Sequence, residues 1–325
     1  MKFRTIVDIP PHPKPIALSE QGLALGSCFA ESIGQKLQEA LFPICINPLG
    51  TLYNPISLAG LVKRALEQRP FQEQEFFLYQ ELWRHFSIHS NLARTSREAA
   101  LSLANRQLSE LGQRLADASY LILTLGSAWA YWHQSTQQFV GHNHRLPLEG
   151  FEKRLLSVEE ITGELGSMLA HLSTANPRLR IICSVSPVKH TRDGLRQNNL
   201  SKSALLLSLH KLEISYPNIY YFPAYEILID ELRDYRFFRE DLAHPSDAAI
   251  DYIWERFIQS SVDESTHSTI QEAQAIRATF SHRTQHPDTI AHARSLNALR
   301  SRIDRLAAAG IDVDALRQEL KRFET

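Results

Sequence analysis

Two candidate nucleophiles stand side by side in the stretch GLALGSCFAESIG, residues 22–34. An apolar run ends at Gly26, Ser27 and Cys28 follow it, and a helix-like pattern begins directly afterwards. The first turn of a helix offers free backbone N–H groups and the positive end of the helix dipole, and both favour an anion. We therefore expect a lowered pKa for the Cys28 thiol, and N–H groups able to hold a developing oxyanion.

A candidate base lies near the other end of the chain. Asp241 and His244 are three residues apart, and Pro245 and an amphipathic helical pattern follow them. This spacing can place both side chains on one side of the turn, so that the histidine acts as a base and the aspartate orients its ring. A nucleophile and a histidine–aspartate pair together indicate acyl-transfer chemistry.

The elements that must position these residues alternate between strands and helices. Five short apolar runs predict strands, at residues 23–27, 43–47, 119–126, 179–187 and 219–226. Because the runs are continuously apolar, they are typical of parallel strands covered on both faces. Longer patterns between them predict helices, at residues 29–41, 55–68, 96–118, 157–175 and 199–216. The sequence therefore predicts a three-layer α/β/α fold with a central, mostly parallel sheet.

Two segments interrupt this alternation, at residues 71–96 and 129–153. Insertions at the ends of sheet strands often build substrate pockets, so we expect both segments to wall the site. The candidate substrate-binding residues are His89, Trp129, His144 and Asn198. The aromatic residues of the insertions would suit a carbohydrate-like face, although core packing explains them equally well; they are Tyr79, Trp83, Trp129, Tyr131 and Trp132.

The histidines of the insertions also raise the alternative of a metal enzyme. His142 and His144 have a spacing that can serve a metal on a strand, with His89 or His133 as a further ligand. Carboxylates that would complete such a site are not evident nearby, so we predict neither a metal nor another cofactor.

The composition changes after about residue 260 to two helical stretches separated by residues 284–287. We expect one domain at residues 1–260, which includes both insertions, and a C-terminal helical hairpin at residues 261–325. The second stretch has an apolar stripe that ends before Gly310: Leu296, Leu299, Ile303 and Leu306. The first stretch has a facing stripe, which is Ile270, Ala273, Ile276 and Phe280. We expect the two stripes to pack against each other rather than to form a homo-oligomer interface.

The whole-chain composition excludes several classes of protein. A net charge of −1 over 325 residues gives no reason to expect nucleic acid as a partner. No apolar stretch reaches the length of about 20 residues that spans a bilayer, and the start of the chain lacks a signal-peptide core, so we expect a cytoplasmic protein. The three cysteines form no Cys-x-x-Cys pair, which argues against disulfides and a zinc ribbon. Cys45 and Cys183 fit buried, inert thiols.

Five segments of the chain, in order, resemble the GSCFA-domain family, which is placed in the SGNH (GDSL-like) hydrolase superfamily. They are GSCFAESIG, INPLGTLYNP, LTLGSAWAYW, SVSPVKHTRDGLRQNNLSKSALL and YFPAYEILIDELRDYRFFREDLAHPS, within a region of about residues 3–257. The resemblance implies an SGNH-hydrolase or flavodoxin-like fold and a reaction at an ester bond.

The superfamily pattern implies roles for the first two of its four blocks. When its Gly-Asp-Ser is aligned on Gly26, Ser27 stands at the Asp position and Cys28 at the nucleophile position. Gly50 matches the oxyanion-hole glycine of the second block, and the Cys28 N–H would be its partner in that hole. Ser27 would then support the helix as its N-cap.

The third and fourth blocks match in part. Gly126 matches the glycine of the third block, but Ala128 stands where the pattern has the asparagine that donates to the oxyanion. Such a donor is worth about a hundredfold or more in rate. Asp241 and His244 match the fourth block in full.

Two functions fit these residues. The first is ester hydrolysis or O-acyl transfer on a small-molecule or carbohydrate ester, through an acyl-enzyme on Cys28, or on Ser27 if the alignment is shifted by one residue. The second is an SGNH-like protein that binds a ligand without turnover, which is consistent with Ala128.

Overall fold

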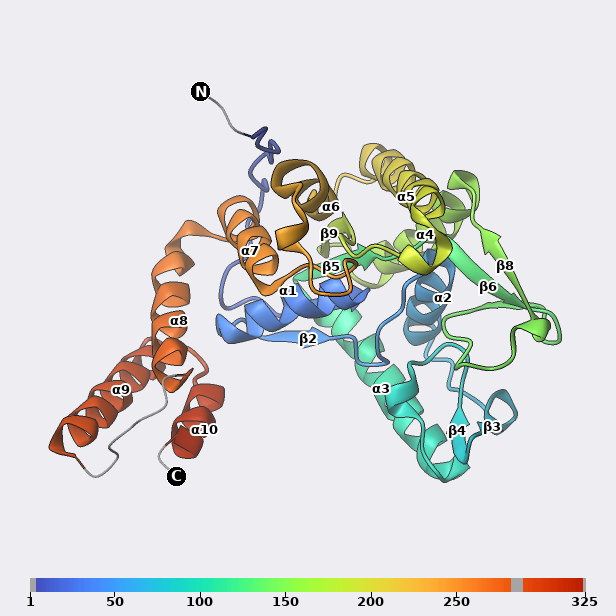
Figure 1. The fold of residues 1–325 in the computed structure, drawn as a ribbon. Coiled ribbons are helices and arrows are strands. Elements are labelled where there is room, and N and C mark those ends of the chain that lie inside the picture. Colours follow the sequence, from blue (N-terminus) through green and yellow to red (C-terminus); the bar gives the residue numbers. More distant parts are fainter. Residues whose placement is uncertain (1–3, 282–288, 324–325) are drawn as a thin grey trace.

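Five parallel strands form the central sheet of the computed structural model, which describes residues 4–281 and 289–323 (Figure 1). The strands lie in the order β10-β9-β5-β1-β2. Their bounds are β1 Gly22–Gly26, β2 Ile44–Ile46, β5 Tyr120–Leu125, β9 Arg180–Val185 and β10 Ile219–Tyr221. Numbered among themselves, they have the order 2-1-3-4-5 of flavodoxin-like folds. The predicted three-layer α/β/α fold is confirmed.

Alternate residues of the strands serve two separate cores, one on each face of the sheet. Leu23 and Leu25 of β1 pack with one set of helices, which are α2 Pro55–Leu66, α3 Arg97–Asp117, α4 Val158–Ala175 and α5 Leu195–Ser215. Ala24 and Ile122 face the other way and pack with α1 Cys28–Glu39 and α7 Asp247–Ser261. Because helices cover both faces, both sets of strand side chains are apolar.

One predicted strand is only partly correct. The run at residues 219–226 was expected to be extended throughout, but β10 ends at Tyr221. Pro223 has no backbone N–H to donate to a sheet, and the chain turns there into α6 Ala224–Glu226 and a π-helical turn, Ile227–Leu232. The other four predicted strands are present within one or two residues of their expected bounds.

The two insertions each form a small antiparallel sheet. The first contains a hairpin of β3 Phe77–Tyr79 and β4 Leu82–Arg84, and the second contains three strands in the order β7-β6-β8. The bounds of these three are β6 Trp129–His133, β7 Gln138–Val140 and β8 Phe151–Leu155. The backbone N–H groups of Gly141 and His142 both donate to Phe86 O, at 2.9 and 3.0 Å. The two insertions therefore form one unit, called the insertion lobe below.

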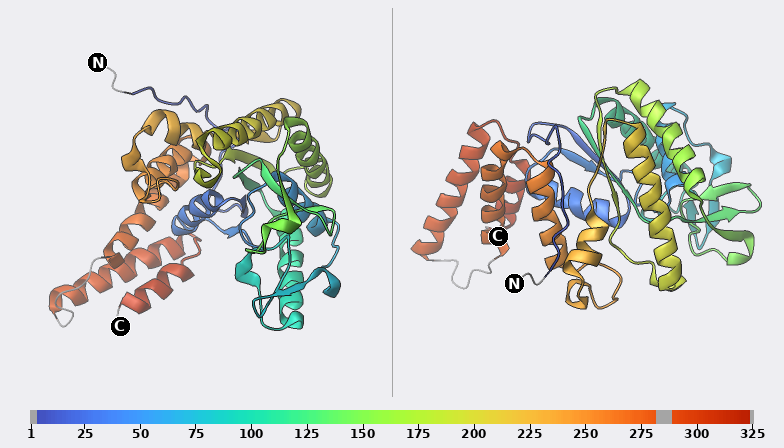
Figure 2. Two further views of the ribbon diagram at one scale, coloured as in Figure 1. Left: turned by 45° about the vertical axis from the view of Figure 1, so that its right-hand side comes forward. Right: turned by 90° about the horizontal axis from the view of Figure 1, so that it is seen from above.

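The C-terminal extension stands beside the sheet domain in every view (Figures 1 and 2). It contains α8 His267–Ser281, α9 Ile290–Ala308 and α10 Asp314–Phe323, so a third helix joins the two that were expected. These helices share an apolar core, which includes Ala273, Ile276, Leu299, Ile303, Leu306, Val313, Leu316 and Leu320. Gly310, at φ +80°, follows the end of α9 as predicted. The expected linker at residues 284–287 lies outside the described residues.

None of the helices in residues 4–281 and 289–323 has the length and apolar character needed to cross a membrane.

Candidate active site

The turn between β1 and α1 is shaped by a glycine that no other residue could replace without strain. Gly26 has φ +123°, and a Cβ at this position would collide with the backbone of Thr124 in the neighbouring strand β5. The Gly26 N–H donates to Asn47 Oδ1 at 2.9 Å, and the Ser27 N–H donates to Thr124 O at 2.9 Å. The chain therefore leaves β1 in one fixed direction and begins α1 immediately.

Ser27 and Cys28 have different surroundings at this turn. Ser27 is 1% exposed, and its Oγ accepts the Phe29 N–H at 3.3 Å, which confirms the predicted N-cap. Cys28 is the first residue of α1 and is partly exposed. In the described part of the chain, the Cys28 backbone N–H has no hydrogen-bond partner beyond its own thiol. Cys28 is therefore the more exposed of the two candidate nucleophiles.

The predicted lowering of the Cys28 pKa is wrong. Burial raises the pKa of the thiol, and this effect outweighs the opposing effects of its own backbone N–H and the positive charge of Lys202. Desolvation disfavours the thiolate because the anion loses its water. A Cys28 nucleophile in this environment needs a base or a nearby cation to form its thiolate at neutral pH.

Asp241 and His244 form the expected pair on the loop before α7. Asp241 Oδ1 accepts the backbone N–H groups of Ala243 and His244, at 3.0 and 2.9 Å. The His244 Nδ1 lies 2.6 Å from Asp241 Oδ2. The backbone N–H of His244, then that of Ala243, and then the His244 ring hold the pKa of Asp241 well below its ordinary value. The pair is therefore a carboxylate that orients an imidazole.

The loop that carries this pair is fastened beside the end of β9. The Lys189 N–H, four residues after β9, donates to Ala243 O at 3.0 Å, and the Arg239 N–H donates to His244 O at 2.8 Å. The His244 side chain is 46% exposed. Within the described residues no hydrogen bond joins His244 to Cys28, and none is recorded for His244 Nε2. The predicted triad therefore remains a prediction, with its base available to solvent.

The β2–α2 loop folds over the nucleophile turn. Its Leu52 N–H donates to Gly26 O at 3.0 Å, and Tyr53 O accepts the N–H groups of Gly126 and Ser127 at 3.0 and 3.1 Å. The Gly50 N–H donates to Asn47 O at 2.7 Å, within the loop itself. Gly50 would therefore have to give up this bond to serve as the oxyanion donor that the family resemblance implies.

Helix α5 reaches the turn after β5, a feature that the sequence analysis missed. The Ala128 N–H donates to Ser201 Oγ at 2.8 Å. The adjacent Lys202 Nζ donates to Gly126 O and Ser186 O, both at 2.7 Å. The sequence contained a signal for this arrangement, because Lys202 has helical spacing with Leu205, Leu209 and Leu212, the apolar stripe of α5.

Three of the predicted substrate-binding residues make hydrogen bonds to the backbone of neighbouring segments of the chain. Asn198 is 2% exposed, and its Oδ1 accepts the His190 N–H at 2.9 Å. The ring of His144 is buried, with Nε2 2.9 Å from His85 O. The Trp129 indole donates to Gln197 O at 3.2 Å, and the ammonium of Lys153 lies 5.2 Å from its ring centre.

The fourth, His89, connects the insertion lobe to the β2–α2 loop. The His89 N–H donates to Leu49 O at 3.1 Å, and its ring centre lies 4.8 Å from that of His142. His142 Nε2 lies 2.6 Å from Thr51 O, and its ring contacts Tyr53 edge-on. The lobe therefore lies at the same end of the sheet as Gly50.

Three histidines in this region have pKa values lowered by burial. Burial lowers the pKa of His142 to about 3, and lowers those of His144 and His190 to about 4, so all three are neutral at pH 7. Among residues 4–281 and 289–323, no group of three or more His, Cys, Asp or Glu side chains could hold a metal ion.

A cavity of about 310 Å³ adjoins Gly50 and the outer side of α1. Its lining is polar and consists of Glu31, Gln35, Gln38, Ile46, Asn47, Gly50, Thr51 and Asn91. The first insertion contributes Asn91, whereas the aromatic residues that were expected to form a carbohydrate-like face are absent from this lining. Asn47 Nδ2 is buried and has no hydrogen-bond partner among the described residues.

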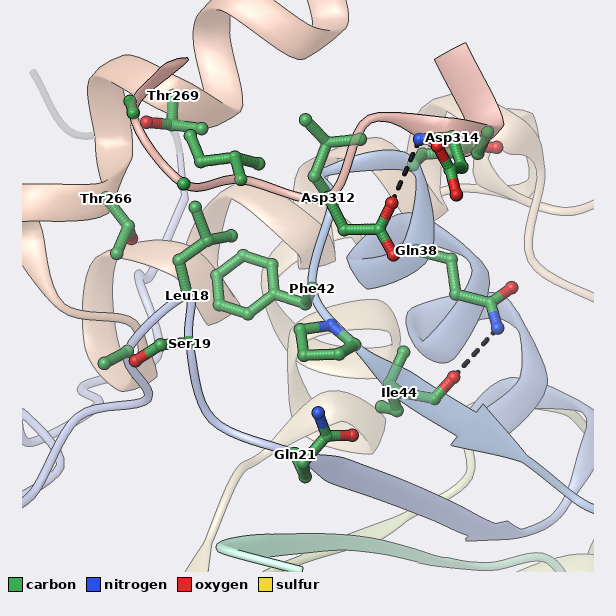
Figure 3. Close-up of a pocket in the computed structure, with 18 of the residues that line it drawn as sticks. Leu18, Ser19, Gln21, Gln38, Phe42, Ile44, Thr266, Thr269, Asp312 and Asp314 are labelled. Atoms are coloured by element: carbon green, nitrogen blue, oxygen red, sulfur yellow. Dashed lines mark hydrogen bonds between the residues drawn. The ribbon is translucent and has the colours of Figure 1, made fainter. Parts of the chain in front are cut away.

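A larger cavity, of about 1080 Å³, lies between α1, the start of β2 and the C-terminal extension (Figure 3). Phe42 and Ile44 lie on its sheet-domain side, and Thr269 and Asp312 come from the extension. Its lining includes none of the candidate catalytic residues. Of the candidate catalytic and oxyanion-hole residues, only Gly50 lines the smaller cavity, and none lines the larger one.

The strand order explains why the turns after β1 and β5 lie side by side. In open parallel sheets, ligands bind at the carboxyl ends of the strands where the strand order reverses, which here is between β1 and β5. Ser27 follows β1, and Gly126 follows β5. The class of protein is thus an α/β protein with a candidate active site at the switch point of a parallel sheet.

The chain belongs to the GSCFA family, which matches residues 22–257. This region contains every candidate site residue and excludes the C-terminal extension. No curated protein matches the chain.

Proposed function

We propose that the chain catalyses acyl transfer through a thioester on Cys28. The observation that carries the proposal is the place of this thiol: it is partly exposed, at the first residue of α1, at the switch point of the sheet. Its backbone N–H has no acceptor within its helix, and an orientated Asp241–His244 pair lies on a loop fastened beside β9. The resemblance to SGNH hydrolases, which act on esters, supports the same reaction.

In the acylation step, His244 Nε2 takes the thiol proton, directly or through one water, while Cys28 Sγ attacks the ester carbonyl carbon. The carbonyl electrons move to oxygen, and the Cys28 N–H donates to that oxyanion. When the intermediate collapses, the carbon–oxygen bond breaks and the alcohol leaves with the proton from His244. Asp241 stabilises the imidazolium and keeps its Nδ1 proton in place.

In the deacylation step, water or a second hydroxyl compound attacks the thioester. His244 takes the proton of the attacking hydroxyl group, and the carbon–sulfur bond breaks after the second tetrahedral intermediate. The thiolate leaves and regains its proton from His244. The products are an acid, if water attacks, or a new ester, if another alcohol attacks.

The polar cavity beside Gly50 supports a hydroxylated, carbohydrate-like substrate. Four of its lining residues carry carboxamides, and one carries a carboxylate: Gln35, Gln38, Asn47, Asn91 and Glu31. Carboxamides both donate and accept hydrogen bonds, which suits the hydroxyl groups of a polyol. The buried Asn47 Nδ2 is a donor without a partner in the described structure, and a hydroxyl oxygen would satisfy it.

A second candidate function, ligand binding without turnover, is favoured by the state of the expected oxyanion donors. The Gly50 N–H is already bonded to Asn47 O, and the Ala128 N–H is bonded to Ser201 Oγ. Of these three groups, the Cys28 N–H alone has no acceptor other than its own thiol among the described residues. An enzyme with one donor would be slower than one with three.

Two measurements distinguish these functions: acetate release from acetylated sugars, and the heat of binding of free sugars. Acyl transfer predicts release of acetate from acetylated sugars or from a simple activated ester, with loss of release in Cys28→Ala. Ligand binding predicts a saturable heat of binding for the sugar and the same background acetate release in Cys28→Ala and the unaltered protein. Equal rates in these two proteins would therefore reject the acyl-transfer proposal.

We also infer that residues 1–260 carry the activity and that residues 261–325 form an appended helical unit. No candidate site residue lies in the extension. The stripe of α9 that was considered for a homo-oligomer packs with α8 and α10 instead. Ile270 of α8 packs into the core of the sheet domain, which fixes the extension to it.

A further inference from the structure

Lys202 is a buried cation in the layer of helices behind the candidate site. The residue is 1% exposed, and its ammonium group donates to the carbonyl oxygens of Gly126 and Ser186, each at 2.7 Å. These carbonyls follow β5 and β9, so the ammonium lies at the carboxyl end of the sheet. Burying an ammonium is costly, and a lysine is rarely placed in a core without a specific partner.

The nucleophile turn lies directly against the residue that Lys202 holds. A Cβ placed on Gly126 would lie 3.3 Å from Ser27 Cβ, and Cys28 is the next residue. The two titratable groups affect each other in both directions. The charge of Lys202 lowers the pKa of the Cys28 thiol, and a Cys28 thiolate raises the pKa of Lys202.

No carboxylate neutralises Lys202 in the described part of the chain. No acidic side chain hydrogen-bonds or pairs with its ammonium group among those residues. Burial lowers the pKa of Lys202 to about 7, and the charge of a Cys28 thiolate opposes this effect. Among the groups that shift the pKa of Lys202, the Cys28 thiol is the one that can supply a negative charge.

The other groups around Lys202 and Cys28 do not supply a negative charge that would neutralise Lys202. His190, on the loop after β9, has a pKa lowered to about 4 by burial and by Lys202, so it is neutral at pH 7. The Tyr225 ring centre lies 5.8 Å from Lys202 Nζ. Glu31, on α1, raises the pKa of Cys28, and burial, Cys28 and Glu31 raise the pKa of Tyr53, in the β2–α2 loop.

We propose that Lys202 is the counter-ion of the Cys28 thiolate. Its ammonium group, held between the carbonyls of Gly126 and Ser186, stabilises the negative charge on sulfur from the interior of the protein. The thiol proton passes to His244 or to water, and the thiolate in turn raises the pKa of Lys202, which favours the ammonium form. Lys202 is thus a positioning residue that acts through Cys28. The inference rests on the proposed function only for the choice of Cys28 as the reacting group.

The test is the pH dependence of Cys28 alkylation by iodoacetamide, measured on the full-length protein by peptide mass spectrometry. The variant is Lys202→Met, and the matched control is Lys211→Met, an exposed lysine on the same helix that pairs with Glu159. We expect Lys202→Met to move the midpoint of the pH–rate profile of Cys28 alkylation upward by about one pH unit or more. This shift lowers the alkylation rate tenfold or more at pH 7. The rates should converge at high pH, and Lys211→Met should keep the midpoint.

A merely structural role for Lys202 would give a different result. It would lower the melting temperature or change the alkylation rate equally at every pH, and an unmoved midpoint in Lys202→Met would overturn the proposal. Because alkylation needs no ester, this outcome is independent of whether the protein transfers acyl groups.

If Lys202→Met does not fold, the unaltered protein provides a second test. A buried ammonium beside Cys28 should raise the rate of Cys28 alkylation by the anion iodoacetate relative to the rate of alkylation by neutral iodoacetamide. The reference is the same rate ratio for an unfolded peptide of residues 22–34. A higher ratio in the protein supports the counter-ion, and an equal or lower ratio rejects it.

Discussion

His244 Nδ1 lies 2.6 Å from Asp241 Oδ2, and the same carboxylate accepts the His244 backbone N–H at 2.9 Å. An ionised carboxylate can only accept hydrogen bonds, so Nδ1 must carry the proton and Nε2 must present its lone pair. The Ala243 N–H also donates to this carboxylate, so two backbone bonds hold Asp241 in place and its third bond orients the imidazole. This is the preparation that a general base requires.

Replacing Asp241 by Asn should therefore remove activity while the fold remains. The carboxamide could present its N–H₂ group to Nδ1 and favour the wrong tautomer, so we expect kcat/KM for an activated ester to fall by about 10³–10⁴. Asp251→Asn is the control, because it makes the same change on α7 at a carboxylate that pairs with Lys36 of α1, away from the site. Similar activities in the two variants would show that Asp241 does not orient a catalytic base.

The neutral histidines of the site predict a loss of stability in acid. Burial lowers the pKa of His142 to about 3, so this residue stays neutral in the folded protein while it is protonated in the unfolded chain below about pH 6.5. The unfolded state then binds more protons. The stability contribution is complete above pH 6.5 and is lost as pH falls toward the folded-state value.

His142→Gln should make the free energy of unfolding less dependent on pH. The loss of one titrating proton reduces the slope by at most about 1.4 kcal/mol per pH unit, and urea unfolding at several pH values between 4.5 and 7 measures it. His210→Gln, at an exposed position of α5, is the control. A slope as steep in His142→Gln as in the unaltered protein would contradict the neutral state of His142.

Replacement of Gly50 by alanine should destabilise the protein, whereas the same replacement at Gly60 should not. Gly50 has φ +82°, and an added Cβ would collide with the side chain of His89, so Gly50→Ala should cost about 1–3 kcal/mol. Gly60 lies inside α2 with no atom within 4 Å of an added Cβ. Gly60→Ala should stabilise the protein by about 0.5–1 kcal/mol, because alanine restricts the unfolded chain more than glycine does.

Thermal and urea unfolding measure both glycine variants, and the ester assay adds a functional comparison. We expect Gly50→Ala to lose activity as well, since the β2–α2 loop contacts the nucleophile turn through Leu52 and Gly26. Unchanged stability in Gly50→Ala would show that this loop adapts to a side chain.

Much of this arrangement could be predicted from local sequence. Continuous apolar runs predicted four of the five central strands closely. The polar residues after the first run indicated the Ser27–Cys28 turn, and a three-residue spacing before a helix indicated the Asp241–His244 pair. Capping chemistry correctly predicted that Ser27 begins α1. These features depend on residues that are close together in the chain, so one sequence is enough to predict them.

Other features depend on contacts between residues far apart in the chain. The Ala128 N–H donates to Ser201, 73 residues later, and Lys202 reaches back 76 residues to Gly126. The rise in the Cys28 pKa comes from burial by the folded protein, which helix position alone does not reveal. The helical stripe of α5 was the one local clue that Lys202 faces the core.

The most direct measurement is the mass of the acyl adduct on the nucleophile turn after incubation with a panel of activated esters. The account predicts one acyl group on Cys28 in the unaltered protein, none in Cys28→Ala, and a weaker but detectable adduct in Ser27→Ala. The weakening follows from loss of the N-cap, at a cost of about 1 kcal/mol. An adduct that persists in Cys28→Ala and disappears in Ser27→Ala would contradict the account and assign the attack to Ser27.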